Sequence, residues 1–272
     1  MEQFSNIAYS IPYVLLLLFY AVLALLWDTS TDKLRTNITI YCVMAYMLFF
    51  GLRGFVFDDW VNYYPAFEKC SLDSIVNIMH TVDDNFFEPG FMILMILCKF
   101  ICPYFQFFVF VCCAINCVLL LNFFRKYVDN IPLAFVFFIC MGGIVIQTNL
   151  MRNSLALLVF VNSLVLIEKK RFLPYLFVCL ICVSFHLSSL LFVPLYFFYN
   201  KHISKWIYLA LIIVGNITFL LDLNFMTNIL ISFAGRFGEE YELLVERYTE
   251  GVLAEKSVTL QLDIWNVYLL RF

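Results

Sequence analysis

One arginine in this sequence stands where a charge is costly. Arg152 lies in the stretch QTNLMRNSLALLVF, between two runs apolar enough for the interior of a membrane. A charged side chain at the centre of a bilayer costs about 2.5–3.5 kcal/mol on insertion scales. Arg152 therefore needs either a position near the membrane surface or an anionic partner. That partner is either an acidic residue elsewhere in the chain or an anionic substrate.

Other ionisable residues flank the apolar runs in a similar way. Arg53, Asp58 and Asp59 follow one run, Glu88 precedes another, and His186 interrupts a third. Ionisable groups at membrane depth are functional candidates by default. Guanidinium binds phosphate through two hydrogen bonds, and a carboxylate or imidazole beside it can accept a proton. Each residue also has an ordinary interpretation, as a surface charge or a buried hydrogen-bonded histidine.

Aromatic residues accompany the two aspartates in the stretch LRGFVFDDWVNYYPAF. Trp60, Tyr63, Tyr64 and Phe67 have the spacing of a short amphipathic helix that lies at the membrane surface. Tryptophan and tyrosine favour that depth in any membrane protein. The same rings could also form a platform for sugar rings, and both interpretations stay open.

Several chemistries have no support in the sequence. The three histidines, at positions 80, 186 and 202, lack metal-ligand spacing, so we expect no metal. Cys179 and Cys182 form a CxxC pair, but it lies in an apolar run without a second pair. Neither a G-x-S-x-G motif nor a glycine-rich phosphate loop occurs. We expect no cofactor, and the net charge of −3 gives no reason to expect a nucleic-acid partner.

The composition requires a membrane. The chain is 64% hydrophobic and 14% charged, whereas soluble domains are about 45–50% apolar and about 25% charged. Two runs, 89–102 and 172–199, are short or interrupted, and six others can cross or nearly cross a core about 30 Å thick: 11–27, 36–52, 104–124, 131–147, 150–167 and 205–221. We predict an all-α, polytopic membrane bundle of about eight hydrophobic helices or half-helices, in a single domain over 1–272.

Charges in the short loops predict the orientation of the bundle. Nine basic residues lie in four loops between the apolar runs: Lys33, Arg35, Arg125, Lys126, Lys169, Lys170, Arg171, Lys201 and Lys205. Basic loops are usually cytoplasmic, which leaves 53–88 and 222–260 as outer loops. Cys70 and His186 are then accessible from outside. This orientation requires 89–124 to cross the membrane once in net and 172–199 to enter and return on the same side. If every run were a simple span, the basic residues would be divided almost evenly between the two sides of the membrane.

The order of the motifs resembles a known family. The segments LRGFVFDDWVNYYPAF, EPGF, NLMRNSLAL and KKRFLPYLFVCLICVSFHLSSLLFVPLYF, over 53–199, are similar to the EpsG family of exopolysaccharide polymerases, relatives of the Wzy O-antigen polymerases. Two positions differ, since Asn153 stands where the family commonly has glutamine and Phe57 stands where it usually has glycine. The chain also ends as a new apolar run begins, so the resemblance implies a truncated C-terminus.

The resemblance implies an enzyme that transfers a glycan from polyprenyl diphosphate to another lipid-linked repeat unit, without a metal. The site would face the exterior of the bacterial inner membrane. Membrane lipids, a chain-length regulator and a flippase are the other implied partners. An O-antigen ligase and a lipid-linked oligosaccharide flippase are the alternatives.

The same resemblance assigns roles to residues. It implies Arg152, His186, Asp59 and Glu88 as catalytic residues. It implies substrate binding by Arg53, Asp58, Tyr63, Tyr64, Arg247 and Tyr248, the last two from the segment ERYTEGVL. We interpret the partner of Arg152 as the leaving diphosphate, with Glu88 or Asp59 as the alternative.

Overall fold

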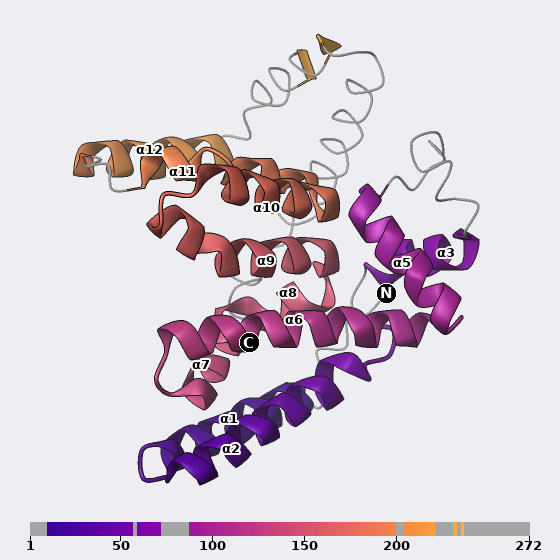
Figure 1. The fold of residues 1–272 in the computed structure, drawn as a ribbon, viewed down its shortest axis with the longest axis vertical. Helices are drawn as coiled ribbons and strands as arrows, with labels where there is room; N and C mark the ends of the chain where they lie inside the picture. Colours follow the sequence, from indigo (N-terminus) through magenta and orange to yellow (C-terminus); the bar gives the residue numbers. More distant parts are fainter. Residues whose placement is uncertain are drawn as a thin grey trace. The chain divides into compact units, whose positions relative to one another are not determined.

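A computed structural model describes residues 10–56, 59–71, 87–199, 204–220, 231–232 and 235–236. Within these ranges every regular element is a helix (Figure 1). The chain divides into two units, Met1–Asn200 and Lys201–Phe272. Most of the predicted outer loop 222–260 lies outside the described residues, and the single domain over 1–272 stays a prediction.

The first unit contains the helices predicted from five of the six long apolar runs. They are α1 (Ile11–Trp27), α2 (Asp32–Tyr46) with a π-helical turn (Met47–Gly51), α6 (Phe105–Tyr127), α7 (Ile131–Phe138) with a π-helical turn (Ile139–Gly143) and α8 (Ile144–Thr148), and α9 (Met151–Glu168). Four helices of the described residues are long and apolar enough to cross a membrane: Asp32–Gly51, Phe105–Tyr127, Ile131–Thr148 and Met151–Glu168. The all-α membrane bundle is therefore confirmed.

The two short or interrupted runs form broken helices. Helix α5 (Pro89–Ile101) ends before Pro103, whose ring cannot continue a helix. Helix α10 (Phe172–Phe185) ends at His186, where the backbone is extended. A short 3₁₀ helix (Leu187–Phe192) and α11 (Leu195–Phe198) follow it. Whether 172–199 re-enters the membrane stays a prediction.

The predicted amphipathic helix is α3 (Trp60–Lys69), and its place at the membrane surface stays a prediction. Its buried residues are Tyr63, Ala66 and Phe67, so one face packs against the protein, as the spacing predicts. The aromatic side chains of α3 join a buried cluster with α5 and α6.

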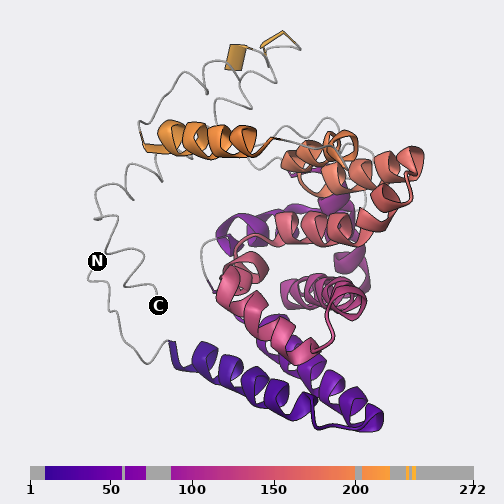
Figure 2. The same cartoon turned by 90° about the vertical axis from the view of Figure 1, so that its left-hand side faces the viewer.

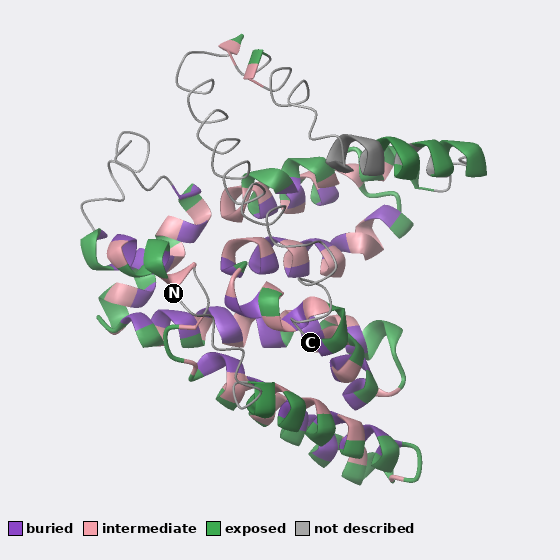
Figure 3. Ribbon diagram, turned by 180° about the vertical axis from the view of Figure 1, so that it is seen from behind, coloured by how far each residue is buried: buried purple, intermediate pink, exposed green. Residues whose placement is uncertain are grey.

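Helix α6 runs between α9 and the α1–α2 pair, as two perpendicular views show (Figures 1 and 2). On one side it packs with α1, α2 and α7, where the ring of Phe135 stacks on Tyr20 and meets Phe124 edge-on. On the other side, α9 and α10 share a smaller core around Tyr175. Many exposed residues of the first unit are large and apolar, which suits contact with lipid; Figure 3 colours the exposed residues green. Helix α12 (Lys205–Leu220) belongs to the second unit.

Candidate functional site

A buried carboxylate joins three distant segments of the chain. Glu88 Oε2 accepts a hydrogen bond from Arg152 Nη1 at 2.7 Å. Glu88 Oε1 accepts the Leu187 N–H at 3.0 Å and lies 3.0 Å from His186 Nδ1. Three of the four residues predicted to be catalytic therefore meet at one point.

Each of these side chains sits at a helix end. Glu88 is the residue before α5, Arg152 lies in the first turn of α9, and His186 follows the last turn of α10. The extended backbone at His186 breaks the helix, which leaves the Leu187 N–H free to bind Glu88. A helix break thus supplies both an imidazole and a backbone donor.

Gly90 allows the ends of α5 and α10 to meet. A Cβ atom on Gly90 would lie 2.8 Å from the backbone oxygen of Ser184 and would also collide with its Oγ. Such an approach is open only to glycine. The glycine in EPGF therefore brings Glu88 within reach of His186.

Helix α3 supplies a second set of contacts to Arg152. The Tyr63 hydroxyl donates to Asp59 Oδ2 at 2.9 Å and accepts from Arg152 Nε at 3.4 Å. The guanidinium carbon lies 4.8 Å from the centre of the Phe87 ring and 5.7 Å from that of Tyr63. We call Glu88, Arg152, His186, Tyr63 and Asp59 the Glu88 cluster.

The electrostatics of the Glu88 cluster favour a charged carboxylate. Burial raises the pKa of Glu88, but the hydrogen bond with His186, the charge of Arg152 and the Leu187 N–H outweigh burial and lower the pKa to about 2. Burial raises the pKa of the Tyr63 hydroxyl. At neutral pH, therefore, Glu88 is an anion and Tyr63 keeps its proton.

This geometry answers the question that Arg152 raised. Glu88, the alternative to the diphosphate, is an anionic partner of Arg152 in this structure, and binding of the diphosphate by Arg152 stays a prediction. No rule of local helix spacing identifies this pair, because Glu88 precedes Arg152 by 64 positions. Any role for Arg152 in binding a diphosphate must start from an existing ion pair.

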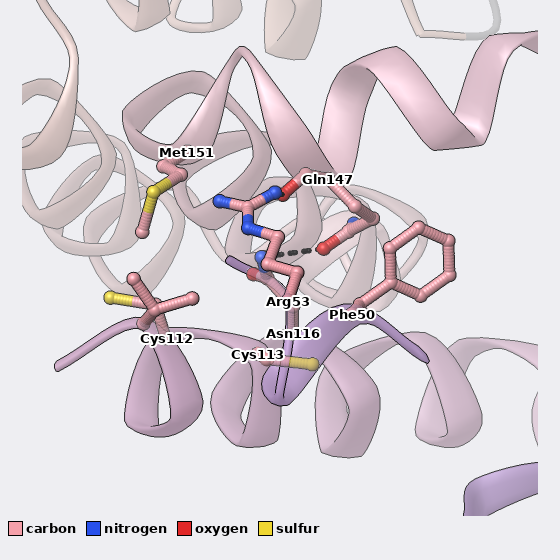
Figure 4. A pocket seen from close by; sticks show the side chains of 8 residues that line it. Phe50, Arg53, Cys112, Cys113, Asn116, Gln147 and Met151 are labelled. Carbon is pink, nitrogen blue, oxygen red and sulfur yellow. Dashed lines mark hydrogen bonds between the residues drawn. The ribbon is translucent and has the colours of Figure 1, made fainter. Parts of the chain in front are cut away.

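Arg53 belongs to a different polar group. Its Nη1 donates to the carbonyl oxygen of Gln147 at 2.6 Å, beside a small cavity with room for about one water molecule (Figure 4). Asn116 Nδ2 donates to Gln147 Oε1 at 2.9 Å and to Ser154 Oγ at 2.8 Å. Among the described residues, no hydrogen bond or ion pair joins Arg53 to the Glu88 cluster.

The EpsG family profile matches residues 37–270 of the chain. The protein belongs to the EpsG family. The match includes every segment of the Glu88 cluster and extends beyond 53–199, where the motifs show the resemblance. Membership suggests a function of the exopolysaccharide-polymerase type, and the apolar helices make this EpsG protein a membrane protein. No curated protein and no solved structure matches the chain.

Of the other residues predicted to bind substrate, the structure describes Tyr64 but not Asp58, Arg247 or Tyr248. Tyr64 of this EpsG protein packs edge-on against Phe55 and Phe105, with ring centres 5.4 and 5.5 Å apart. Asp58, Arg247 and Tyr248 lie outside the described residues, so their roles stay predictions.

Sequence reasoning missed Lys99 and Asn149. Lys99 Nζ donates to the carbonyl oxygens of Phe67, Glu68 and Cys70 at 2.8, 2.7 and 2.9 Å, at the C-terminal end of α3. Asn149 Oδ1 accepts the backbone N–H of Asp59 at 3.0 Å. The sequence offers one signal for Lys99, which is a lysine inside the apolar run of α5. Nothing in the local sequence distinguishes Asn149.

The expected accessibility of Cys70 is wrong. Its side chain is 4% exposed, and its Sγ donates to the carbonyl oxygen of Phe67. The loop position is polar, but Cys70 belongs to the buried cluster formed by α3, α5 and α6. The expected absence of a metal stays a prediction. In the part of the chain that the structure describes, no group of three or more His, Cys, Asp or Glu side chains is placed to hold one.

Proposed function

We propose that this EpsG protein polymerises an exopolysaccharide, capsule or O-antigen by transferring a glycan from polyprenyl diphosphate to the non-reducing end of a second lipid-linked repeat unit. The observation that supports this proposal most is the convergence of Glu88, Arg152 and His186. They come from three separate segments that resemble the family, and membership of the family agrees with the reaction.

The reaction sets three demands on the protein. A hydroxyl of the acceptor's terminal sugar forms a bond with the anomeric carbon of the donor glycan, while the bond from that carbon to the diphosphate oxygen breaks. The hydroxyl proton moves to a base, and the bonding electrons leave with the diphosphate. The site must therefore hold a base, a cation for the leaving group and a surface for two glycans.

His186 is the base in this proposal. With a proton on Nδ1 held by Glu88, the Nε2 atom of the neutral ring accepts the hydroxyl proton, as in other carboxylate–histidine pairs. Glu88 itself is a weak base because its pKa is about 2. Its role is to fix the ring and to stabilise the imidazolium that forms. General-base catalysis of this kind contributes about 10²–10⁴-fold.

Arg152 binds the leaving diphosphate in this proposal. Guanidinium stays charged at any working pH and donates in a planar fork that matches phosphate oxygens. Tyr63, whose hydroxyl already contacts Arg152 Nε, orients that fork. Arg53 holds the turn between α8 and α9 through Gln147, so we assign it to positioning Arg152 and not to the diphosphate.

The site faces the exterior of the bacterial inner membrane in this proposal, where lipid-linked repeat units meet. A flippase that delivers them and a chain-length regulator would be partner proteins. The polymerase works without a metal, so polymer formation by the purified protein should persist in EDTA. Chelator-sensitive activity that returns with Mg²⁺ or Mn²⁺ would contradict this part of the proposal.

The test is polymerisation by the purified full-length protein in proteoliposomes with lipid-linked repeat units. His186→Gln and Arg152→Lys should insert normally and lose at least tenfold of the polymer ladder, since Arg152→Lys keeps the charge and loses the fork. Arg125→Lys, at an exposed position in the last turn of α6, is the matched control. Wild-type polymer from Arg152→Ala would refute the proposal, and transfer to a lipid A core in place of a ladder would identify a ligase.

A further inference from the structure

The ion pair between Glu88 and Arg152 stands where an anionic ligand would have to bind. The two side chains are 8% and 17% exposed, and 2.7 Å separates Oε2 from Nη1. The rings of Phe87 and Tyr63 flank the same guanidinium. An anion that approaches the fork of Arg152 therefore meets a carboxylate that already uses part of it.

Glu88 has partners that remain if it leaves Arg152. Its other oxygen, Oε1, is bound by the Leu187 N–H and lies within hydrogen-bond distance of His186 Nδ1. A small rotation of the carboxylate can therefore release Arg152 while Glu88 keeps its hydrogen-bond partners at Oε1. Arg152, by contrast, is a buried cation, and taking the carboxylate from a buried charge is strongly destabilising unless another anion replaces it.

From this asymmetry we propose that Glu88 is a built-in counter-anion, which occupies Arg152 in the empty protein and is displaced by the diphosphate of the incoming lipid-linked glycan. The inference rests on the proposed function, because it takes the diphosphate as the ligand of Arg152. It adds that the apparent affinity for this ligand is set by competition with an internal carboxylate.

A second consequence follows for the base. While the site is empty, the charge of Glu88 is shared between Arg152 and His186. When the diphosphate takes Arg152, the carboxylate acts on the imidazole alone. Binding of the diphosphate to Arg152 thus strengthens the interaction of Glu88 with His186, the base. Binding of the donor is in this way coupled to activation of the acceptor hydroxyl.

The test uses inorganic pyrophosphate as the probe and calorimetry on the purified full-length protein. Glu88→Gln keeps the side-chain length and an oxygen for the Leu187 N–H but removes the charge, so pyrophosphate should bind at least tenfold more tightly than to the wild type. Glu68→Gln removes an exposed carboxylate from α3 and should change the affinity by less than twofold. In the double variant Glu88→Gln/Arg152→Gln the gain should vanish.

Glu88→Asp guards against loss of folding in Glu88→Gln. It keeps the charge but withdraws the carboxylate from Arg152, and it should tighten pyrophosphate binding by a smaller factor. Each of the following overturns the inference: unchanged or weaker binding in both variants, no binding to any form, an equal gain in Glu68→Gln, or a gain that survives in the double variant. If Arg152→Lys loses polymer while Glu88→Gln leaves the affinity unchanged, the polymerase function stands and the counter-anion role falls. If affinity rises in Glu88→Gln while Arg152→Ala makes wild-type polymer, the polymerase role of this site falls and displacement of Glu88 stands.

Discussion

At the scale of single residues, the Glu88 cluster depends on one carboxylate with a low pKa. The folded protein holds the pKa of Glu88 at about 2, below its ordinary value of 4.5. A group whose pKa is lowered by folding stabilises the fold above its unfolded pKa, and that contribution is lost as the pH falls through the folded pKa. The stabilisation that the Glu88 carboxylate contributes is therefore lost as the pH falls from 4.5 to about 2.

Glu88→Gln should remove this pH dependence. At neutral pH the variant should be less stable than the wild type, because Arg152 loses its buried partner. The difference in melting temperature between the two proteins should narrow as the pH falls from 4.5 toward about 2, where the wild-type carboxyl also becomes neutral. Thermal unfolding of the purified proteins over this range measures it. A difference that stays constant with pH would show that the charge of Glu88 does not contribute.

Gly90 is the second residue with a specific structural demand. Gly90→Ala should push α5 from α10, because the new Cβ would lie 2.8 Å from the backbone oxygen of Ser184. We expect a loss of stability of about 1–3 kcal/mol and a loss of polymer beyond the fall in protein abundance. Gly54→Ala is the matched control, since nothing lies within 4 Å of its Cβ position. Equal behaviour of the two variants in thermal unfolding and polymer assays would contradict the close approach.

At the scale of elements, α3 is held to α5 at its C-terminal end by Lys99. Carbonyl groups in the last turn of a helix lack intrahelical donors and carry partial negative charge. Lys99 binds three carbonyl oxygens at this end of α3, at 2.7–2.9 Å. Tyr63 of the same helix contacts Arg152, so Lys99, which is not part of the Glu88 cluster, helps to position that cluster through α3.

Lys99→Met should loosen α3 and expose Cys70, whose thiol is buried at the end of this helix. We expect alkylation of Cys70 by a maleimide to become at least tenfold faster, as followed by mass spectrometry of the peptide. Lys69→Met, in the last turn of α3 at an exposed position, should leave the rate unchanged. Slow alkylation of Cys70 in both variants would show that the packing of α3 does not need the lysine.

The elements could be predicted from the sequence, and the contacts between them could not. Hydrophobic runs predict α1, α6 and α9 well because lipid requires a continuous apolar stretch of fixed length. Pro103 and the polar residues around His186 likewise mark the two breaks. The pairing of Glu88 with His186 spans 98 positions, and no local pattern encodes it. Lys99 stands out as a lysine in an apolar run, but its carbonyl partners lie about 30 positions earlier on another helix, so the contact itself could not be predicted.

At the scale of the whole molecule, α9 relates the Glu88 cluster to the orientation in the membrane. Its 18 residues rise about 27 Å, which is close to the thickness of the hydrocarbon core of about 30 Å. Arg152 lies in its first turn, and Lys169, Lys170 and Arg171 follow its end. If α9 crosses the membrane, the basic loop and the Glu88 cluster are on opposite sides. A cytoplasmic basic loop, as the positive-inside rule expects, then places Glu88 and His186 toward the exterior.

The orientation can be tested by labelling added cysteines with a membrane-impermeant maleimide in intact cells. Because Cys70 is buried, the outer reporter is Glu68→Cys, at an exposed position on α3. It should react in intact cells, whereas Lys170→Cys, in the exposed turn between α9 and α10, should react only after permeabilisation. Lys201→Cys should behave like Lys170→Cys, as its loop charge predicts. The protein without an added cysteine gives the background from its native thiols. Labelling of Lys170→Cys in intact cells, with protection of Glu68→Cys, would reverse the orientation and move the Glu88 cluster to the cytoplasmic side. There it could not meet repeat units that a flippase has already delivered to the exterior.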